Sequence, residues 1–465
     1  MASLDSLDRG YVEHRLAEEW LIGGDRSLAF RLFKQRLHEL NQRVRESHMP
    51  TILLAELDPV QFLASFIAAC VAKCPVFLGN PRWTKVEWQQ VVERVQPDVI
   101  WASPELQRIS SYTRYDRTEQ GRIGRGQIMI PTGGSSGQIR FAIHTWQTLV
   151  ASVRGFQDYF NSECVNACCV LPLYHVSGLM QFMRCFVSGG TLAVSQFRDL
   201  ETDNTLPFNP AEFFLSLVPT QLQRVLENPQ AASQLARFQT VLLGGAPAWA
   251  DLLETARHYQ IRLALTYGMT ETASQIATLK PEEFLAGCVS AGRILPHATV
   301  TIDPDYQNQG STMGRLSIYA KSLALGYFGD RPFNGLFQPD DLGFIDDQGY
   351  LRLVGRSSDK IITGGENVFA AEVAAAIRKT GLVRDVTVIG VGDRHWGEAV
   401  TAVYVPSGHA SNPENLSQAL TGQLTKFKHP KHWIRVDSLP RNAQGKLNRR
   451  AMQQLAETSL SDVSD

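Results

Sequence analysis

The sequence predicts an α/β protein with a large N-terminal layered α/β domain built on parallel sheets and a small α+β C-terminal lid domain. From residue 51 onward, apolar strand-like runs alternate with amphipathic helical runs, a pattern typical of parallel-sheet layers. Glycine-rich or polar turns follow several strand-like runs, at the edge where open α/β sheets bind ligands. The pattern changes after Leu336, where a hairpin precedes mixed helix and strand. We therefore predict domains at residues 1–355 and 356–465.

The predicted elements follow from hydrophobic periodicity and from the Gly and Pro residues that interrupt it. Residues 11–49 have the pattern of one charged, amphipathic helical region. The strand-like runs of the first domain are residues 51–56, 74–78, 98–102, 167–171, 191–194, 215–218, 240–243 and 262–265. Its helical runs are residues 59–72, 84–95, 219–228 and 250–259. The lid is predicted to contain a hairpin turning at 346–349, helices 370–379 and 414–426, and strands 386–391, 399–405 and 433–436.

Composition narrows the class of protein. A chain of 465 residues with 44% hydrophobic and 20% charged residues is typical of a soluble globular protein of two or three domains. Its 45 basic and 46 acidic residues argue against a nucleic-acid surface. The apolar segment 62–72 is too short to span a bilayer. The seven cysteines are read as small core residues of a reducing compartment, so we expect a cytoplasmic protein without a membrane span.

A glycine-rich loop stands out in the stretch "IMIPTGGSSGQIRFAIHTW", residues 128–146. Consecutive glycines leave backbone N–H groups free to converge on an anion, and neighbouring hydroxyls add further donors. The stretch lacks the Gly-Lys-Ser/Thr ending of a Walker loop. A mobile connection is the alternative, but the position between a strand-like and a helix-like run favours a phosphate loop. Its candidate ligands are Thr132, Gly133, Gly134, Ser135, Ser136 and Gly137.

The stretch "TYGMTETAS" offers an acidic candidate, Glu271. This carboxylate follows a turn at Gly268 and stands beside Thr270 and Thr272. A carboxylate here could hold Mg²⁺ against phosphate oxygens. The alternative is a capped helix start, with Thr270 as the N-cap and Glu271 in the first turn.

Three further side chains are candidates. His175 comes just after a strand-like run, where either a structural or a catalytic role is open. Arg184 lies in an apolar stretch and needs an acidic partner, supplied by the protein or by a ligand. Lys446 lies on a loop of the predicted lid, where it could neutralise charge at phosphorus or remain a solvated surface lysine.

Five motifs occur in a fixed order: "PTGGSSGQIR", "YGMTET", "DLG" at Asp341, "GRSSDKIITGGENV" and "PRNAQGKLNR". Through them, residues 51–450 resemble the acyl-adenylate-forming enzymes, which include acyl-CoA synthetases, peptide-synthetase adenylation domains and luciferases. Within this superfamily, "LPLYHVSGL" and "YGMTETASQIATL" are similar to the branch of 2-succinylbenzoate–CoA ligases, which serve menaquinone or phylloquinone synthesis. The resemblance implies ATP, Mg²⁺, coenzyme A and 2-succinylbenzoate as the small-molecule partners.

The resemblance also implies roles for individual residues. The loop Thr132, Gly133, Gly134, Ser135, Ser136 and Gly137 would hold the β- and γ-phosphates of ATP. Gly244, Gly245 and Ala246 would line the adenine and acyl pocket, with Tyr267 stacking near the base. Thr270 would contact the α-phosphate, Glu271 the Mg²⁺ ion, and Asp341 with Arg356 the ribose hydroxyls. Lys446 would stabilise the adenylation transition state, Arg184 would bind the substrate carboxylate that is not activated, and His175 would close the acyl pocket.

The sequence departs from the family pattern in the glycine-rich loop. The family loop usually ends in Pro-Lys, whereas this chain has Gln138-Ile139-Arg140, so Arg140 has no assigned role. The hinge is also left open within residues 356–359. The alternatives to be tested are another aryl- or acyl-CoA ligase, transfer to a carrier-protein thiol, and a non-catalytic nucleotide-binding homologue. The sequence is compatible with a homodimer but does not fix the oligomeric state.

Overall fold

The computed structural model describes two compact units of the chain. The described residues are 7–46, 49–110, 123–133, 139–202, 206–303, 313–363, 366–393, 395–408, 411–441 and 447–461. The first unit comprises Met1–Gly245, Ala256–Thr299 and Tyr319–Phe337, and the second comprises Ala246–Thr255, Val300–Ile318 and Gln338–Asp465. The predicted boundary between residues 355 and 356 stays a prediction.

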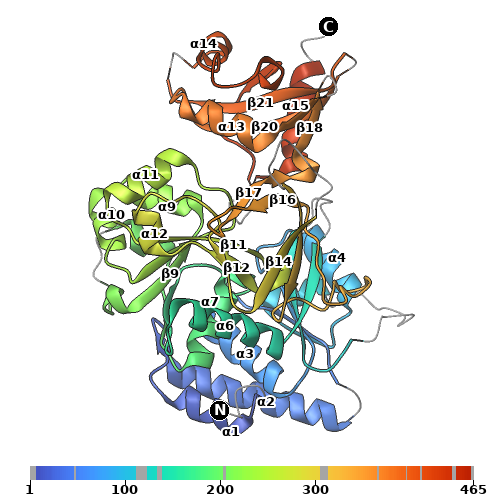
Figure 1. Cartoon of the computed structure of the whole chain (residues 1–465). Helices are drawn as coiled ribbons and strands as arrows, with labels where there is room; N and C mark the ends of the chain where they lie inside the picture. Colours follow the sequence, from blue (N-terminus) through green and yellow to red (C-terminus); the bar gives the residue numbers. More distant parts are fainter. Residues whose placement is uncertain are drawn as a thin grey trace. The chain divides into compact units, whose positions relative to one another are not determined.

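The larger sheet of the first unit confirms the predicted α/β class (Figure 1). In the described residues it runs in the order β1-β8-β7-β9-β10-β11-β12-β13. The pairs from β1 to β11 are parallel, and β12 and β13 are added antiparallel. The strands are β1 Leu21–Ile22, β7 Asn166–Cys169, β8 Leu192–Val194, β9 Phe213–Leu217, β10 Thr240–Leu243, β11 Leu263–Met269, β12 Ser274–Thr278 and β13 Arg293–Ile294.

A second sheet of the same unit carries the glycine-rich stretch. Its order is β4-β2-β3-β5-β6, parallel as far as β5 and antiparallel between β5 and β6. The strands are β2 Ile52–Ala55, β3 Val76–Leu78, β4 Val99–Ala102, β5 Gln127–Gly133 and β6 Ile139–Thr145. The helices of the unit are α1 Arg9–Ala17, α2 Arg26–Glu46, α3 Pro59–Val71, α4 Lys85–Val95, α5 Pro104–Ser110, α6 Trp146–Phe160, α7 Val176–Ser188, α8 Phe197–Glu201, α9 Pro219–Leu226, α10 Pro229–Leu235 and α12 Pro281–Leu285, and α11 Ala250–His258 crosses between units.

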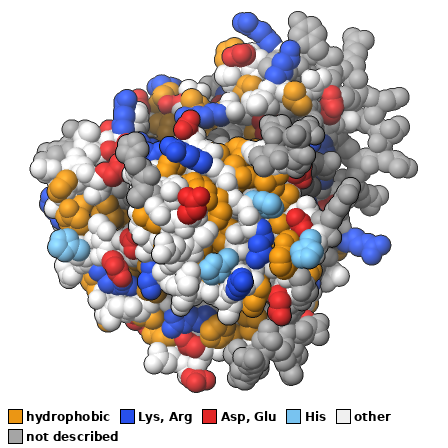
Figure 2. Space-filling view, turned by 90° about the horizontal axis from the view of Figure 1, so that it is seen from above, with side chains coloured by type: hydrophobic (Ala, Val, Ile, Leu, Met, Phe, Trp, Pro, Cys, Tyr) orange, Lys and Arg blue, Asp and Glu red, His pale blue; other side chains and the backbone are white. Residues whose placement is uncertain are grey.

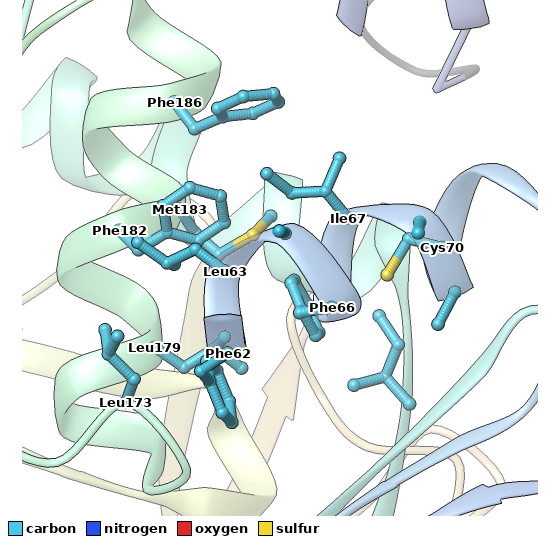
Figure 3. Close-up of a cluster of buried hydrophobic side chains, with 14 of the residues drawn as sticks. Phe62, Leu63, Phe66, Ile67, Cys70, Leu173, Leu179, Phe182, Met183 and Phe186 are labelled. Carbon is cyan, nitrogen blue, oxygen red and sulfur yellow. The ribbon is translucent and has the colours of Figure 1, made fainter. Parts of the chain in front are cut away.

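Side chains of α3 and α7 belong to the same apolar core of the first unit. Figure 3 shows the apolar side chains of the two helices pointing toward one another. The rings of Phe66 and Phe182 meet edge to face with centroids 6.1 Å apart, and both rings are fully buried. Burying one such ring stabilises the fold by about 1.5–3 kcal/mol. The contact joins α3 to the middle of α7, the helix that follows β7.

Two sequence predictions in this unit are wrong. Residues 11–49 form two helices separated by β1, because the chain turns at Gly23, where φ is +78° and a Cβ atom would lie 2.2 Å from the Val194 carbonyl oxygen. The run after the glycine-rich loop is strand β6 instead of helix, since it pairs antiparallel with β5. Helix α6 begins only at Trp146, where the Thr145 hydroxyl caps it by accepting from the Thr148 N–H.

The second unit is an α+β structure of two further sheets. In the described residues one sheet has the order β14-β15-β16-β17, and the other has the order β19-β18-β21-β20 with β22 beside β21. The strands are β14 Ala298–Asp303, β15 Gly314–Ala320, β16 Asp341–Ile345, β17 Leu351–Arg356, β18 Lys360–Thr363, β19 Glu366–Phe369, β20 Val383–Asp393, β21 Gly397–Pro406 and β22 His432–Arg435. The helices are α13 Ala370–Lys379, α14 Pro413–Ala419 and α15 Arg449–Ser461.

The hairpin predicted at residues 346–349 is confirmed between β16 and β17, closed by a bond from the Gly349 N–H to the Asp346 carbonyl at 2.8 Å. The helix predicted over 414–426 is wrong in its second half. It ends at Ala419, and Gly422 then takes a φ of +81°, which a helix does not allow.

The surface agrees with the balanced composition. On the face drawn in Figure 2, basic and acidic side chains lie interspersed, and neither sign forms a continuous patch among the described residues. Across the described residues, none of the helices is both long and apolar enough to cross a bilayer.

Candidate functional site

A tight reversal of the chain between β11 and β12 presents Glu271. The turn Thr270–Thr272 is a single 3₁₀ turn, and the chain then returns antiparallel to β11. Gly268 permits this close return, because a Cβ atom there would lie 2.1 Å from the Ser274 carbonyl oxygen. The alternative of a capped helix start at Thr270 is therefore wrong, since a strand follows the turn.

The Glu271 carboxylate is buried where the two sheets of the first unit meet. Its side-chain oxygen Oε1 accepts hydrogen bonds from the Tyr327 hydroxyl at 2.6 Å and from Thr132 Oγ1 at 3.5 Å. Thr132 lies on β5, and Tyr327 forms a bridge with Ala142 of β6. Within the described residues no hydrogen bond reaches Oε2. This second oxygen is the one that could face a cation.

Arg140 supports this arrangement from outside. Its guanidinium lies 3.6 Å from the centre of the Tyr327 ring and pairs with Asp330 at 2.6 Å. The ion pair is exposed and contributes little, whereas a planar cation stacked on an aromatic face holds the ring in place. An arginine suits this contact better than the lysine of the usual family pattern. The geometry thus gives Arg140 a structural role, which the loop motif alone left open.

Tyr327 remains a hydrogen-bond donor to Glu271 at all ordinary pH values. Burial of the hydroxyl, reinforced by the neighbouring Glu271 charge, raises the pKa of Tyr327 well above its usual value. The phenol is therefore protonated, and its O–H donates a charge-assisted hydrogen bond to the Glu271 carboxylate.

His144 fixes the peptide beside Glu271. Its Nε2 lies 2.8 Å from the Thr270 carbonyl oxygen and its Nδ1 lies 3.0 Å from Thr148 Oγ1. Because a carbonyl only accepts, Nε2 carries the proton and Nδ1 accepts from the hydroxyl. Burial lowers the pKa of His144 to about 4, so the ring is neutral near pH 7.

Arg184 is a buried cation on α7. It donates through Nη2 to Ser274 Oγ at 3.0 Å and to Gln275 Oε1 at 2.7 Å, and its guanidinium lies 4.3 Å from the centre of the Phe156 ring. Among the described residues no carboxylate lies within ion-pair distance, and Nε has no hydrogen-bond partner. Burial lowers the pKa of Arg184 to about 10, which leaves it charged near pH 7. The sequence left open whether the acidic partner of Arg184 comes from the protein or from a ligand. The described residues supply no salt bridge to Arg184, so the geometry favours an anionic ligand group.

Other predicted residues of the first unit lie at the carboxyl-terminal edge of the larger sheet. Gly244 and Gly245 follow β10, and a Cβ atom at 244 would lie 2.3 Å from Thr266 Oγ1 on β11. Tyr267 is buried on β11. His175 is the residue before α7, is partly exposed, and has its ring 4.5 Å from that of Tyr174. This is the edge where parallel sheets bind ligands.

In the second unit the structure brings together Asp341 and Arg356. They face each other across β16 and β17, with Arg356 Nε 3.1 Å from Asp341 Oδ1. Ala246 also belongs to this unit, and Gly133 is the last residue of β5. The predicted residues Gly134, Ser135, Ser136, Gly137 and Lys446 lie outside the described residues.

The donor set around Glu271 fits magnesium better than a transition metal. No group of three or more His, Cys, Asp or Glu side chains gathers anywhere in the described part of the chain. Mg²⁺ is commonly bound by one or two carboxylates, with water and phosphate oxygens completing its shell. Glu271 with its remaining oxygen meets that requirement.

Sequence reasoning missed several side chains that build these contacts. Tyr327, Asp330 and His144 contact the Glu271 region from segments far away in the chain, and Gln275 was passed over beside Ser274. The sequence signal for Gln275 was the polar pair Ser274-Gln275 directly after "TYGMTET", and in the structure both side chains accept hydrogen bonds from Arg184.

Comparison with known proteins places the chain in a family. Residues 17–328 match the model of the AMP-binding enzymes, and residues 372–446 match that of the AMP-binding enzyme C-terminal domain. The chain therefore belongs to the AMP-binding enzyme family, as the ordered motifs predicted.

Two curated relatives indicate the branch, and one solved structure shows the same fold. The chain is 34% identical over 337 residues to a 2-succinylbenzoate–CoA ligase of Geobacillus sp. (strain WCH70), covering 70% of this chain and 68% of the relative. It is 29% identical over 424 residues to the enzyme of the same name from Listeria monocytogenes, covering 86% and 88%. Its fold matches o-succinylbenzoate CoA synthetase (MenE) from Bacillus subtilis in complex with the acyl-adenylate intermediate OSB-AMP, with a TM-score of 0.79, 23% identity, and coverage of 95% and 97%.

The buried His144 predicts a specific pH dependence of stability. Its pKa of about 4 in the folded protein is below the usual value of 6.5, so the unfolded chain takes up a proton first as the pH falls. The contribution is complete above pH 6.5 and is lost between pH 6.5 and 4, costing about 1–2 kcal/mol at pH 5. In His144→Gln, the difference in unfolding free energy between pH 7.5 and pH 5, measured with urea, should shrink by this amount. The exposed His258→Gln is the control, and equal pH dependence in wild type and His144→Gln would contradict the assignment.

Proposed function

We propose that the protein is an ATP-dependent 2-succinylbenzoate–CoA ligase of phylloquinone or menaquinone synthesis. Family membership supports the adenylating chemistry. The observation that carries the choice of substrate is the buried guanidinium of Arg184, which has no carboxylate partner among the described residues. A substrate with two carboxylates can be activated at one while the other occupies this cation. The names of the curated relatives agree with this choice.

The first half-reaction joins two anions. A substrate carboxylate oxygen attacks the α-phosphorus of ATP, the bond to the β-phosphate oxygen breaks, and an acyl adenylate and pyrophosphate result. The attack requires cations and N–H donors placed in advance. We assign Glu271 to hold Mg²⁺, whose charge offsets that of the phosphates, and Thr270 to contact the α-phosphate. Residues 132–137 would hold the β- and γ-phosphates.

The remaining assignments follow the motif positions. Asp341 and Arg356 would hold the ribose hydroxyls, and Gly244, Gly245, Ala246 and Tyr267 would line the nucleotide and acyl pocket. Lys446 would stabilise the adenylation transition state. In the second half-reaction the thiol of coenzyme A attacks the acyl carbon and expels AMP. Lys446 has no part in that step, so we propose that a lid of residues 356–465 turns between the two half-reactions.

Substrate discrimination would rest on Arg184. A guanidinium that keeps its charge in an apolar helix binds a carboxylate with charge-assisted hydrogen bonds. Ser274 and Gln275 already hold Nη2, so the guanidinium is fixed before the substrate arrives. His175, at the start of the same helix, would close the acyl pocket.

The reaction class is tested by carboxylate-dependent exchange of labelled pyrophosphate into ATP. Exchange should be fastest with 2-succinylbenzoate and slower by at least about tenfold with benzoate or a fatty acid. A preference for either of the other acids would identify another aryl- or acyl-CoA ligase. Failure with every acid tested would remove the enzyme function, and product formation on a carrier-protein thiol in place of coenzyme A would identify the remaining rival.

The substrate assignment is tested by Arg184→Ala. Loss of charge-assisted hydrogen bonds of about 1.5–3 kcal/mol should raise KM for 2-succinylbenzoate roughly 10- to 150-fold, with a far smaller change in KM for ATP. The exposed Arg237→Ala should behave as wild type. An Arg184→Ala enzyme with unchanged KM for the acid would refute the assignment.

The metal assignment is tested by Tyr327→Phe. The variant keeps the ring that supports Arg140 but removes the hydroxyl that donates to Glu271, so the carboxylate is less firmly held. The Mg²⁺ concentration giving half-maximal exchange should rise by several-fold to about tenfold, while KM for 2-succinylbenzoate changes less. Tyr319→Phe, at an exposed tyrosine, is the matched control. A rise in KM for 2-succinylbenzoate with an unchanged half-maximal Mg²⁺ concentration would argue against a metal role for Glu271.

A further inference from the structure

His297 is a buried titratable side chain that the proposed reaction leaves unused. It follows β13 and is 8% exposed, and neither Nδ1 nor Nε2 has a hydrogen-bond partner within the described residues. A neutral imidazole always carries one N–H donor and one acceptor nitrogen. Burying both nitrogens without partners is unfavourable, and a bound ligand group would relieve that cost.

The ring is held against helix α6 at a position that requires glycine. A Cβ atom at Gly155 would lie 1.8 Å from His297 Nδ1. The next residue on the helix, Phe156, has its ring under the guanidinium of Arg184. Consecutive residues of one helix therefore contact His297 and Arg184 and place the two polar groups in one neighbourhood.

The charges around His297 agree with this placement. Burial is the main cause that lowers its pKa to about 4, the Arg184 charge lowers it further, and Asp158 of α6 acts in the opposite direction. The ring is therefore neutral near pH 7. A neutral ring can offer a directional N–H beside Arg184 without the repulsion of a second cation.

Other unpartnered polar atoms belong to residues next to Arg184. Arg184 Nε and Gln275 Nε2 have no partner among the described residues, although the same two side chains bond each other through Nη2 and Oε1. Gln181 lies one helical turn before Arg184, and its Oε1 likewise has no partner in the described part of the chain. A group of buried donors and acceptors left open together is typical of a place where a ligand supplies the missing partners.

We propose that His297 is a specificity-determining residue whose ring N–H donates a hydrogen bond to the substrate carboxylate that is not activated, beside the Arg184 guanidinium. This inference rests on the proposed function. Gly155 would position the imidazole for this hydrogen bond, because only glycine leaves room for the ring against α6. Arg184 supplies charge and His297 supplies direction, so a carboxylate is distinguished from a neutral group of similar size.

The test compares 2-succinylbenzoate with a matched analogue in which the carboxylate that is not activated is replaced by hydrogen. Pyrophosphate exchange gives KM for both acids and for ATP in wild type, His297→Leu, His297→Gln and Gly155→Ala. His297→Leu should raise KM for the dicarboxylate about tenfold or more and lower the preference for it over the analogue by the same factor. His297→Gln retains an N–H donor and should recover part of the preference. Gly155→Ala, a substitution that helices favour, should reproduce the loss by displacing the imidazole.

His258→Gln, at an exposed histidine, serves as the control and should match wild type. If His297→Leu and Gly155→Ala leave the preference for the dicarboxylate unchanged, or raise KM for both acids and for ATP alike, the assignment of His297 is overturned while the proposed function stands. If wild type itself shows no exchange with 2-succinylbenzoate, the proposed function fails and the assignment fails with it.

Discussion

The reversal of the chain between β11 and β12 is the constraint on which both halves of the proposed site depend. Gly268 allows the returning strand to pass within contact distance, and only then can Glu271 stand at the tip. The first two residues of the returning strand, Ser274 and Gln275, bind the Arg184 guanidinium. One short turn thus places the proposed metal ligand a few residues from the partners of the proposed substrate cation. A shift of Glu271 would therefore also shift Ser274 and Gln275, and with them the position of Arg184.

The sequence predicted much of this fold because its signals are local. Buried parallel strands have continuous apolar runs, so β2, β3, β4, β7 and β10 could be placed within a few residues. The predictions failed where pairing between distant segments decides the structure. The apolar run of β6 is compatible with either a helix or a strand. The antiparallel pairing with β5 decides in favour of the strand. The periodicity of residues 11–49 predicts one helical region, since a strand of two residues such as β1 has no local signal and is stabilised by the distant β8.

The site divides in the same way. Glu271 and Arg184 could be singled out because a carboxylate after a glycine turn and a charge in an apolar helix are unusual within a short window. Tyr327 could not be found, since its contact with Glu271 crosses 56 positions of the chain. The role of Arg140 depended on the same distant ring. A departure from a family motif was visible in the sequence, but the reason for it required the structure.

Glu271 and Arg184 illustrate two different ways of keeping a charge buried. The Glu271 carboxylate is stabilised by a protonated phenol and a hydroxyl, and one oxygen stays available. Among the described residues, the Arg184 guanidinium has neutral partners and an aromatic face, and the imidazole of His297 beside it has no hydrogen-bond partner. Unsatisfied polar groups of this kind lower the stability of the free protein, and apolar side chains of similar volume would pack there at less cost. In the proposed function the substrate would supply the missing partners, so that the lost stability would be recovered as binding free energy and selectivity.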